Sequence, residues 1–235
     1  IAGSSTYIKS QGAYADYYDS YGIWFGTLAS INNVEMYKLV ATSTNTIVFT
    51  GAPVDVASVN IGISAGWNWI GYTPQASMDI GPALSSIDGL ATYIKSQGAY
   101  ADYYDSYGIW FGTLASLEPY AGYMLNAAAG GTLTYPSDGL LTINPNDNMD
   151  GASLERGGDD WMVKASDFEF NGSITIEVKL ENSEVSEGDM LAAFVDGECH
   201  GVVSAINTPF GNHLVFPLMV YGNEEGASMT FKHFD

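Results

Sequence analysis

Residues 6–30 read TYIKSQGAYADYYDSYGIWFGTLAS, and residues 92–116 repeat this stretch letter for letter, 86 positions later. The register then continues without gaps, so that Tyr37 matches Tyr123. Where the copies have diverged, apolar positions remain apolar, as two separately packed cores require. The sequence therefore predicts two copies of one fold. Tandem copies lengthen a chain or multiply a weak binding contact, so they favour a structural or binding role over catalysis.

The Tyr-rich part of the repeat is ambiguous between helix and strand. Four tyrosines have the spacing of one helix face, namely Tyr14, Tyr17, Tyr18 and Tyr21. Against a helix stand several glycines, the turn signal DSYG at residues 19–22 and the β-favouring IWF that follows. We therefore predict a β-hairpin in each copy. A short helix is predicted only at residues 82–87, because proline is accepted in a first turn.

The segment GWNWIGY, residues 66–72, precedes the second copy and has no counterpart before the first. We prefer to assign it as the opening strand of the second copy, which leaves the first copy N-terminally incomplete. The first copy would then need this strand from a neighbour or from chain upstream. In the alternative, the segment folds back to close the first copy, but no equivalent segment follows Tyr135.

A different kind of β module follows the second copy. Four apolar residues alternate as in a half-buried strand, namely Ile174, Ile176, Val178 and Leu180. Asp196-Gly197 separates two apolar runs and suits the positive φ of a tight primed turn. Two further strands are predicted at residues 214–221 and 229–234. Pro217 predicts that the first of these lies at an edge or a bulge.

Several landmarks together carry a resemblance to known proteins. GWNWIGYTPQASMDI, YIKSQ, YYDSYGIWFGTL and EPYAGYML resemble repeat modules of large secreted proteins of Bacteroidetes-type bacteria, over residues 1–136. The motifs GDMLAAFVDGECHG and MTFKHFD resemble those of the Ig-like modules that accompany such repeats. The resemblance implies surface display or secretion in a multidomain chain. It implies no defined ligand.

The predicted fold class is all-β, with tandem small β modules followed by an Ig-like β-sandwich. We expect a first, N-terminally incomplete module at residues 1–50 and a second, complete module at 51–136. A linker at 137–150 and the sandwich module at 151–235 follow. The sandwich is expected to be C-terminally incomplete, which would leave a strand edge to be covered by something else.

Charge and composition narrow the classes of partner. The net charge of -20 would repel nucleic acid and anionic membranes. A single cysteine, Cys199, rules out an internal disulfide. No apolar run approaches the roughly 20 residues of a membrane span. We expect an extracellular or cell-surface location.

Catalytic motifs have little support. Ser64 lies in a GISAG match to the nucleophile elbow, but that motif needs a helix after the serine, and a predicted strand follows here. The three histidines, His200, His213 and His233, lack the close spacing that helps to build a metal site. The acids of the repeat are spaced like turn residues. We predict that the protein is not an enzyme and has no catalytic residues.

One candidate calcium loop lies in the predicted linker. Asn146, Asn148 and Asp150 place oxygen side chains at alternate positions, and Gly151 follows, as in the first half of a calcium loop. The bidentate glutamate of such a loop is missing. Calcium is the only cofactor that the sequence indicates. The preferred interpretation of this segment is an Asx-rich turn, which needs no ion.

The aromatic residues give a candidate carbohydrate site, because flat aromatic faces stack on sugar rings. The candidate residues are Trp67, Trp69, Tyr104, Tyr107 and Trp110. Burial in a core is the commoner role of such side chains.

Two functions remain after these comparisons. The preferred hypothesis is a non-enzymatic structural or adhesive repeat region of a larger bacterial surface or secreted protein. Its partners would be neighbouring modules of the same or another copy, and it could assemble through incomplete β modules. The alternative is a carbohydrate-binding accessory module of a secreted polysaccharide-degrading protein.

Overall fold

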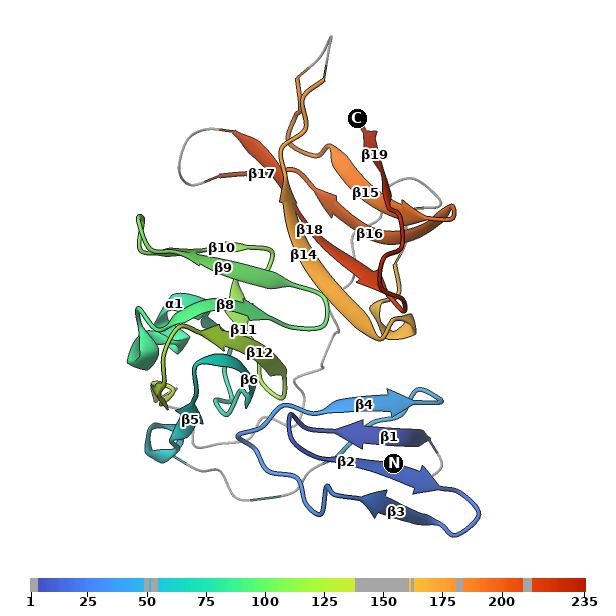
Figure 1. Cartoon of the computed structure of the whole chain (residues 1–235). Coiled ribbons are helices and arrows are strands. Elements are labelled where there is room, and N and C mark those ends of the chain that lie inside the picture. The colour runs from blue at the N-terminus through green and yellow to red at the C-terminus, as the bar shows by residue number, and fades with distance from the viewer. Residues whose placement is uncertain are drawn as a thin grey trace. The chain divides into compact units, whose positions relative to one another are not determined.

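Antiparallel strands dominate the chain in the computed structural model, and the helices are short (Figure 1). The structure describes residues 4–48, 51, 55–137, 161, 163–180, 184–208 and 213–235. The chain divides into two compact units. Unit 1 comprises Ile1–Ser96 with Ala101–Asn146, and unit 2 comprises Gln97–Tyr100 with Asp147–Asp235. The predicted all-β fold class is confirmed. Among the described residues, no helix is long and apolar enough to cross a membrane.

The first copy of the repeat forms a four-stranded antiparallel sheet with the order β3-β2-β1-β4. Its strands are β1 (Ser5–Lys9), β2 (Tyr14–Tyr18), β3 (Ile23–Gly26) and β4 (Lys38–Ala41). A short 3-10 helix, η1 (Val56–Ser58), follows this sheet in the sequence.

The second copy forms a five-stranded antiparallel sheet with the order β10-β9-β8-β12-β6. Its strands are β6 (Gly66–Gly71), β8 (Ala91–Lys95), β9 (Tyr100–Tyr104), β10 (Ile109–Gly112) and β12 (Gly122–Ala127). Two small two-stranded sheets accompany it, β5 (Ile61–Ile63) with β13 (Gly131–Leu133) and β7 (Met78–Asp79) with β11 (Ser116–Leu117).

The Tyr-rich stretch is a β-hairpin in both copies, as predicted. The identical residues also pack alike, because Tyr17 lies 5.2 Å from Trp24 and Tyr103 lies 5.2 Å from Trp110, between ring centroids. Both hairpins turn through a glycine of positive φ, 66° in the first copy and 65° in the second. The tight turn thus overrides the helical spacing of the tyrosines.

The second copy has a core that is closed on one face of its sheet. Ile94, Ala101 and Leu125 point into this core and are completely buried. Residues 61–91 cover them, through β5, the short helix α1 (Ile80–Ala83) and the 3-10 helix η2 (Ser85–Ile87). The short helix predicted near Pro82 is thus present as two consecutive turns.

Unit 2 contains two three-stranded antiparallel sheets with the orders β14-β18-β17 and β16-β15-β19. Leu191, Ala205 and Phe216 form a buried cluster that draws on both sheets. The strands are β14 (Phe170–Ile176), β15 (Met190–Val195), β16 (Glu198–Ser204), β17 (Ile206–Asn207), β18 (Leu214–Gly222) and β19 (Thr230–Phe234), and a 3-10 helix, η3 (Ala165–Asp167), precedes them.

The predicted tight turn and the predicted edge proline of unit 2 both have defined positions in the structure. Asp196 and Gly197 have φ values of 50° and 89°, as a primed hairpin turn between β15 and β16 requires. Pro217 lies in the central strand β18, but β17 pairs only as far as Val215. At Pro217 only β14 is paired, so the missing N–H faces a side without a ladder.

Candidate functional site

The two copies contact each other along the edge of β6 that faces away from β12. One edge of β6 pairs with β12 from Gly66 to Gly71. On the other edge, the Gly71 N–H donates to the Val34 carbonyl (2.9 Å) and the Met36 N–H donates to the Trp69 carbonyl (3.4 Å). The first copy therefore adds a short antiparallel bridge to the edge strand of the second.

A side chain of the first copy completes this edge. The Gln11 side-chain amide donates to the Trp67 carbonyl (2.7 Å) and accepts from the Trp69 N–H (2.8 Å). It thus makes the two bonds that a neighbouring strand would make. Exposed strand edges invite pairing with other chains, and here the first copy occupies this one from Trp67 to Gly71.

GWNWIGY is consequently bonded to both copies. Six residue pairs join it to β12, whereas a single bridge, Glu35 with Ile70, joins it to the first copy. The preferred prediction, that GWNWIGY is the opening strand of the second copy, agrees with its pairing in the five-stranded sheet. The alternative prediction, that it closes the first copy, agrees only with the single bridge to Glu35.

Two opposed glycines allow the close approach of the copies. Gly71 pairs with Gly122 across the sheet. A Cβ at Gly71 would collide with the backbone oxygen of Asn33, and one at Gly122 would collide with the Met36 side chain. Met36 is buried in this contact.

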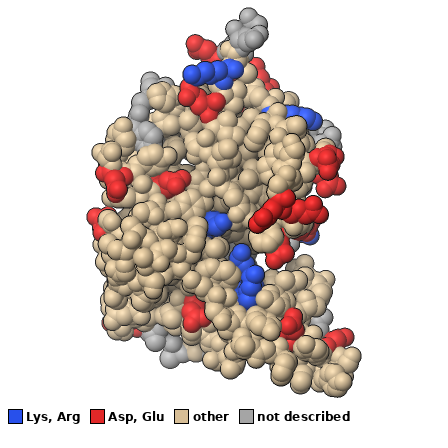
Figure 2. Space-filling view, viewed as in Figure 1, with Lys and Arg blue, Asp and Glu red and all other residues tan. Residues whose placement is uncertain are grey.

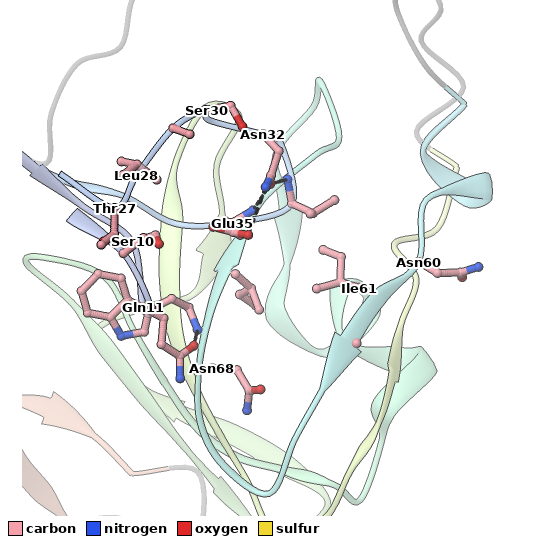
Figure 3. A pocket seen from close by; sticks show the side chains of 17 residues that line it. Ser10, Gln11, Thr27, Leu28, Ser30, Asn32, Glu35, Asn60, Ile61 and Asn68 are labelled. Carbon is pink, nitrogen blue, oxygen red and sulfur yellow. Dashed lines mark hydrogen bonds between the residues drawn. The ribbon is translucent and has the colours of Figure 1, made fainter. Parts of the chain in front are cut away.

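A groove of about 690 Å³ lies between the first copy and strands β5 and β6 (Figure 3). Its polar side chains bond mainly to the surrounding chain. Asn32 accepts from the backbone N–H groups of Val34 and Glu35 (both 3.0 Å), and Asn68 donates to the carbonyls of Ser64 and Gly66 (2.8 and 2.9 Å). These amides hold the walls of the groove in place.

On the sheet face opposite the core, two tryptophans of β6 lie beside lysines. The Lys38 Nζ is 5.3 Å from the Trp69 ring centroid, and the Lys95 Nζ is 5.7 Å from that of Trp67. Trp67 is 42% exposed and contacts Tyr93 edge to face. We call Trp67, Trp69, Lys38 and Lys95 the Trp–Lys platform.

The platform gathers positive charge in a strongly acidic protein. Residues 1–146 contain three basic residues, and the third, Lys9, lies directly opposite Lys38 in the pairing of β1 with β4. Burial, and then the charge of Lys38, lowers the pKa of Lys95. Few basic side chains are visible in the view of Figure 2. An anionic group on the platform would relieve this repulsion.

The five predicted carbohydrate residues do not share one surface. Trp67 and Trp69 lie on the platform. Trp110 packs against the core on the opposite face of the sheet, together with Tyr103. Tyr104 contacts Phe111, and Tyr107 is exposed at the hairpin tip. The structure therefore brings two of the five together, and it adds Lys38 and Lys95, which sequence reasoning did not select.

The predicted calcium loop, the candidate serine and the histidines do not form a site among the described residues. Asn146, Asn148 and Asp150 lie outside the described residues. Ser64 stands in a turn between strands β5 and β6, not before a helix. His233 bonds to the buried Asp189 (2.9 Å) and His200 to the Tyr221 carbonyl (2.8 Å), on different strands. Within the described part of the chain, no three His, Cys, Asp or Glu side chains cluster as a metal site.

Comparison with known proteins adds no relative. No protein-family model matches the chain, and neither a curated protein nor a solved structure shows significant similarity.

Proposed function

We propose that this chain is a non-enzymatic, extracellular structural or adhesive repeat region of a larger bacterial surface or secreted protein. Its modules dock edge to edge in tandem. The observation that carries the proposal is the occupied edge of β6, where Gln11 and residues 34–36 of the first copy bond to Trp67, Trp69 and Gly71. Such docking fixes neighbouring repeats relative to each other, so the tandem array is a rigid spacer and not a set of modules joined by flexible linkers.

Replacing Gly71 by alanine should uncouple the copies, because the new methyl group would collide with the Asn33 backbone. We expect unit 1 of the wild type to unfold in one cooperative transition and that of Gly71→Ala to unfold in two, with a loss of about 1–3 kcal/mol for the first copy. Urea unfolding followed by tryptophan fluorescence and by amide exchange would measure both effects.

Gly62→Ala is the matched control, because a Cβ at Gly62 would meet no atom within 4 Å. If both variants unfold like the wild type in one transition, tandem docking through β6 is wrong.

The Trp–Lys platform favours a second candidate function, binding of an acidic polysaccharide. An exposed indole offers a flat face to a sugar ring, and the ammonium group of the exposed Lys38 offers a charge partner to a carboxylate or sulfate. This supports the accessory-module alternative and restricts its ligands to anionic glycans. The two functions are compatible, because the platform uses the side chains of Trp67 and Trp69 on the sheet face, whereas docking uses the backbone groups at the edge of β6.

Trp67→Ala should strongly weaken this binding. We expect polygalacturonate, alginate or chondroitin sulfate to quench the tryptophan fluorescence of the wild type saturably, and neutral dextran to have no effect. The quench should weaken at least tenfold in Trp67→Ala and several-fold in Lys95→Met, and it should fade at high salt. Lys164→Met in unit 2 is the charge-matched control. The absence of any glycan response would leave the structural function alone.

A further inference from the structure

The repeat places the same residues in two different environments. Ile94 is fully buried in the second copy, whereas its counterpart Ile8 is only half-buried. Leu125 and Leu39 differ in the same way. Because residues 6–30 and 92–116 are identical, their own side chains do not cause this difference.

The contrast is larger where the copies have diverged. Leu117 and Leu133 are 0% exposed, whereas their counterparts Ile31 and Ile47 are 51% and 46% exposed. Among the described residues, these two apolar side chains of the first copy thus remain about half exposed, although Ala15, the counterpart of the buried Ala101, is itself buried. They lie outside the strands of the first sheet, and exposed apolar side chains that gather on one surface are characteristic of a binding site.

The second copy shows what covers these positions. β6 pairs along the outer edge of β12, where the Tyr72 N–H also donates to the Ala121 carbonyl (3.0 Å). Ile80, Leu84 and Ile87 then lie in the core beneath the sheet. Edge and face are therefore closed by one continuous segment, residues 61–90.

The corresponding edge of the first copy is open. β4 pairs with β1, and the described residues provide it with no second strand. The Thr42 N–H donates to the Ser4 carbonyl (2.9 Å), on the β1 side. By the alternation of a strand, Leu39 and Ala41 direct their N–H and C=O groups to the opposite, open side.

We propose that the first sheet is an acceptor for a strand-and-helix segment of a neighbouring repeat module, with the sequence pattern of residues 61–90. The segment adds a fifth strand antiparallel to β4 and closes the apolar face that includes Ile31, Leu39 and Ile47. This inference rests on the proposed function, and it names the surface and the partner through which modules assemble. The mode of binding is strand addition to a sheet edge.

The register of the second copy predicts the contacts of the incoming strand. Met124 pairs with Trp69, and Leu125 pairs with Asn68. In the first copy Lys38 and Leu39 take these places. The incoming tryptophan would then pair with Lys38 across the two strands. The incoming isoleucine and leucine side chains would cover Ile31 and Ile47.

A labelled synthetic peptide with the sequence of residues 61–90 tests the proposal on the whole chain. We expect saturable binding by fluorescence anisotropy and slower amide exchange at Leu39 when the peptide is bound. A scrambled peptide of the same composition should not bind.

Two variants locate the surface. Ile31→Asp and Ile47→Asp each place a charge on the acceptor face, at sites exposed enough to tolerate it in the free chain, and should weaken binding at least about tenfold. Val40→Asp is the matched control. Val40 is 52% exposed and lies on the opposite face of β4, so its variant should bind within about twofold of the wild type.

Two results would overturn the proposal: no peptide binding, or binding insensitive to both aspartates. The Gly71→Ala experiment reports on docking through β6 without any peptide, so the failure of this inference and that of the proposed function can be told apart.

Discussion

Replacing Ile94 by alanine should lower the free energy of unfolding of unit 1 by about 2–5 kcal/mol, whereas the same change at Ile8 should cost less than half as much. Ile94 is completely buried, so its truncation leaves a cavity in a closed core. Ile8 already contacts solvent, and water can fill the space that its side chain leaves.

The two sites form an unusually well-matched pair. Both isoleucines lie in the sequence TYIKSQ, so β propensity and effects on the unfolded chain are the same in both variants. Urea titrations would measure the free energy of unfolding of both variants, and equal m-values would show that the two losses can be compared directly. Equal losses at the two sites would mean that both copies have equally closed cores.

Unit 1 should lose stability steeply above about pH 10. Burial raises the pKa of Tyr135 well above its usual range, and the neighbouring phenols of Tyr72 and Tyr123 add to this shift. Burial likewise raises the pKa of Tyr123. These phenols stay neutral in the fold but ionise in the unfolded chain near pH 10. Their stabilisation is therefore complete below pH 10 and is lost as the pH rises beyond it, by roughly 1.4 kcal/mol per pH unit for each phenol.

Tyr135→Phe should reduce this slope, because the phenylalanine ring fills the same space and cannot ionise. At neutral pH the variant should lose about 1 kcal/mol, since the hydroxyl donates to the Gly71 carbonyl (3.2 Å). Tyr107→Phe is the control, because Tyr107 is 59% exposed. Urea titrations between pH 8 and pH 11.5 would show the slopes, and a flat profile in the wild type would contradict the assignment.

Local chemistry was sufficient to predict much of the fold. The DSYG and Asp196-Gly197 turns fixed three hairpins, because each turn accommodates its strands in one register only. The strand at residues 66–72 was assignable to the second copy because no equivalent segment follows Tyr135. These features depend on residues close together in the sequence.

The candidate site was less predictable, because it depends on register and docking. Trp67 and Trp110 both lie in predicted strands, but strand pairing places them on opposite faces of one sheet. The role of Gln11 could not be predicted, because a single side-chain amide that bonds to a strand edge produces no periodic pattern in the sequence. Residues 1–146 contain only three lysines and no arginine. This scarcity made each lysine a candidate for a specific contact.

The amides of Leu39 and Leu125 offer the most direct test of whether the first copy is an uncovered version of the second. Both lie in the strand beside β1 or β8, and each directs its N–H away from that neighbour. Leu125 faces β6, so its hydrogen exchange should be at least about 100-fold slower than that of Leu39. Equal protection of the two amides in the free chain would mean that something already covers the first sheet, and the acceptor surface would not exist.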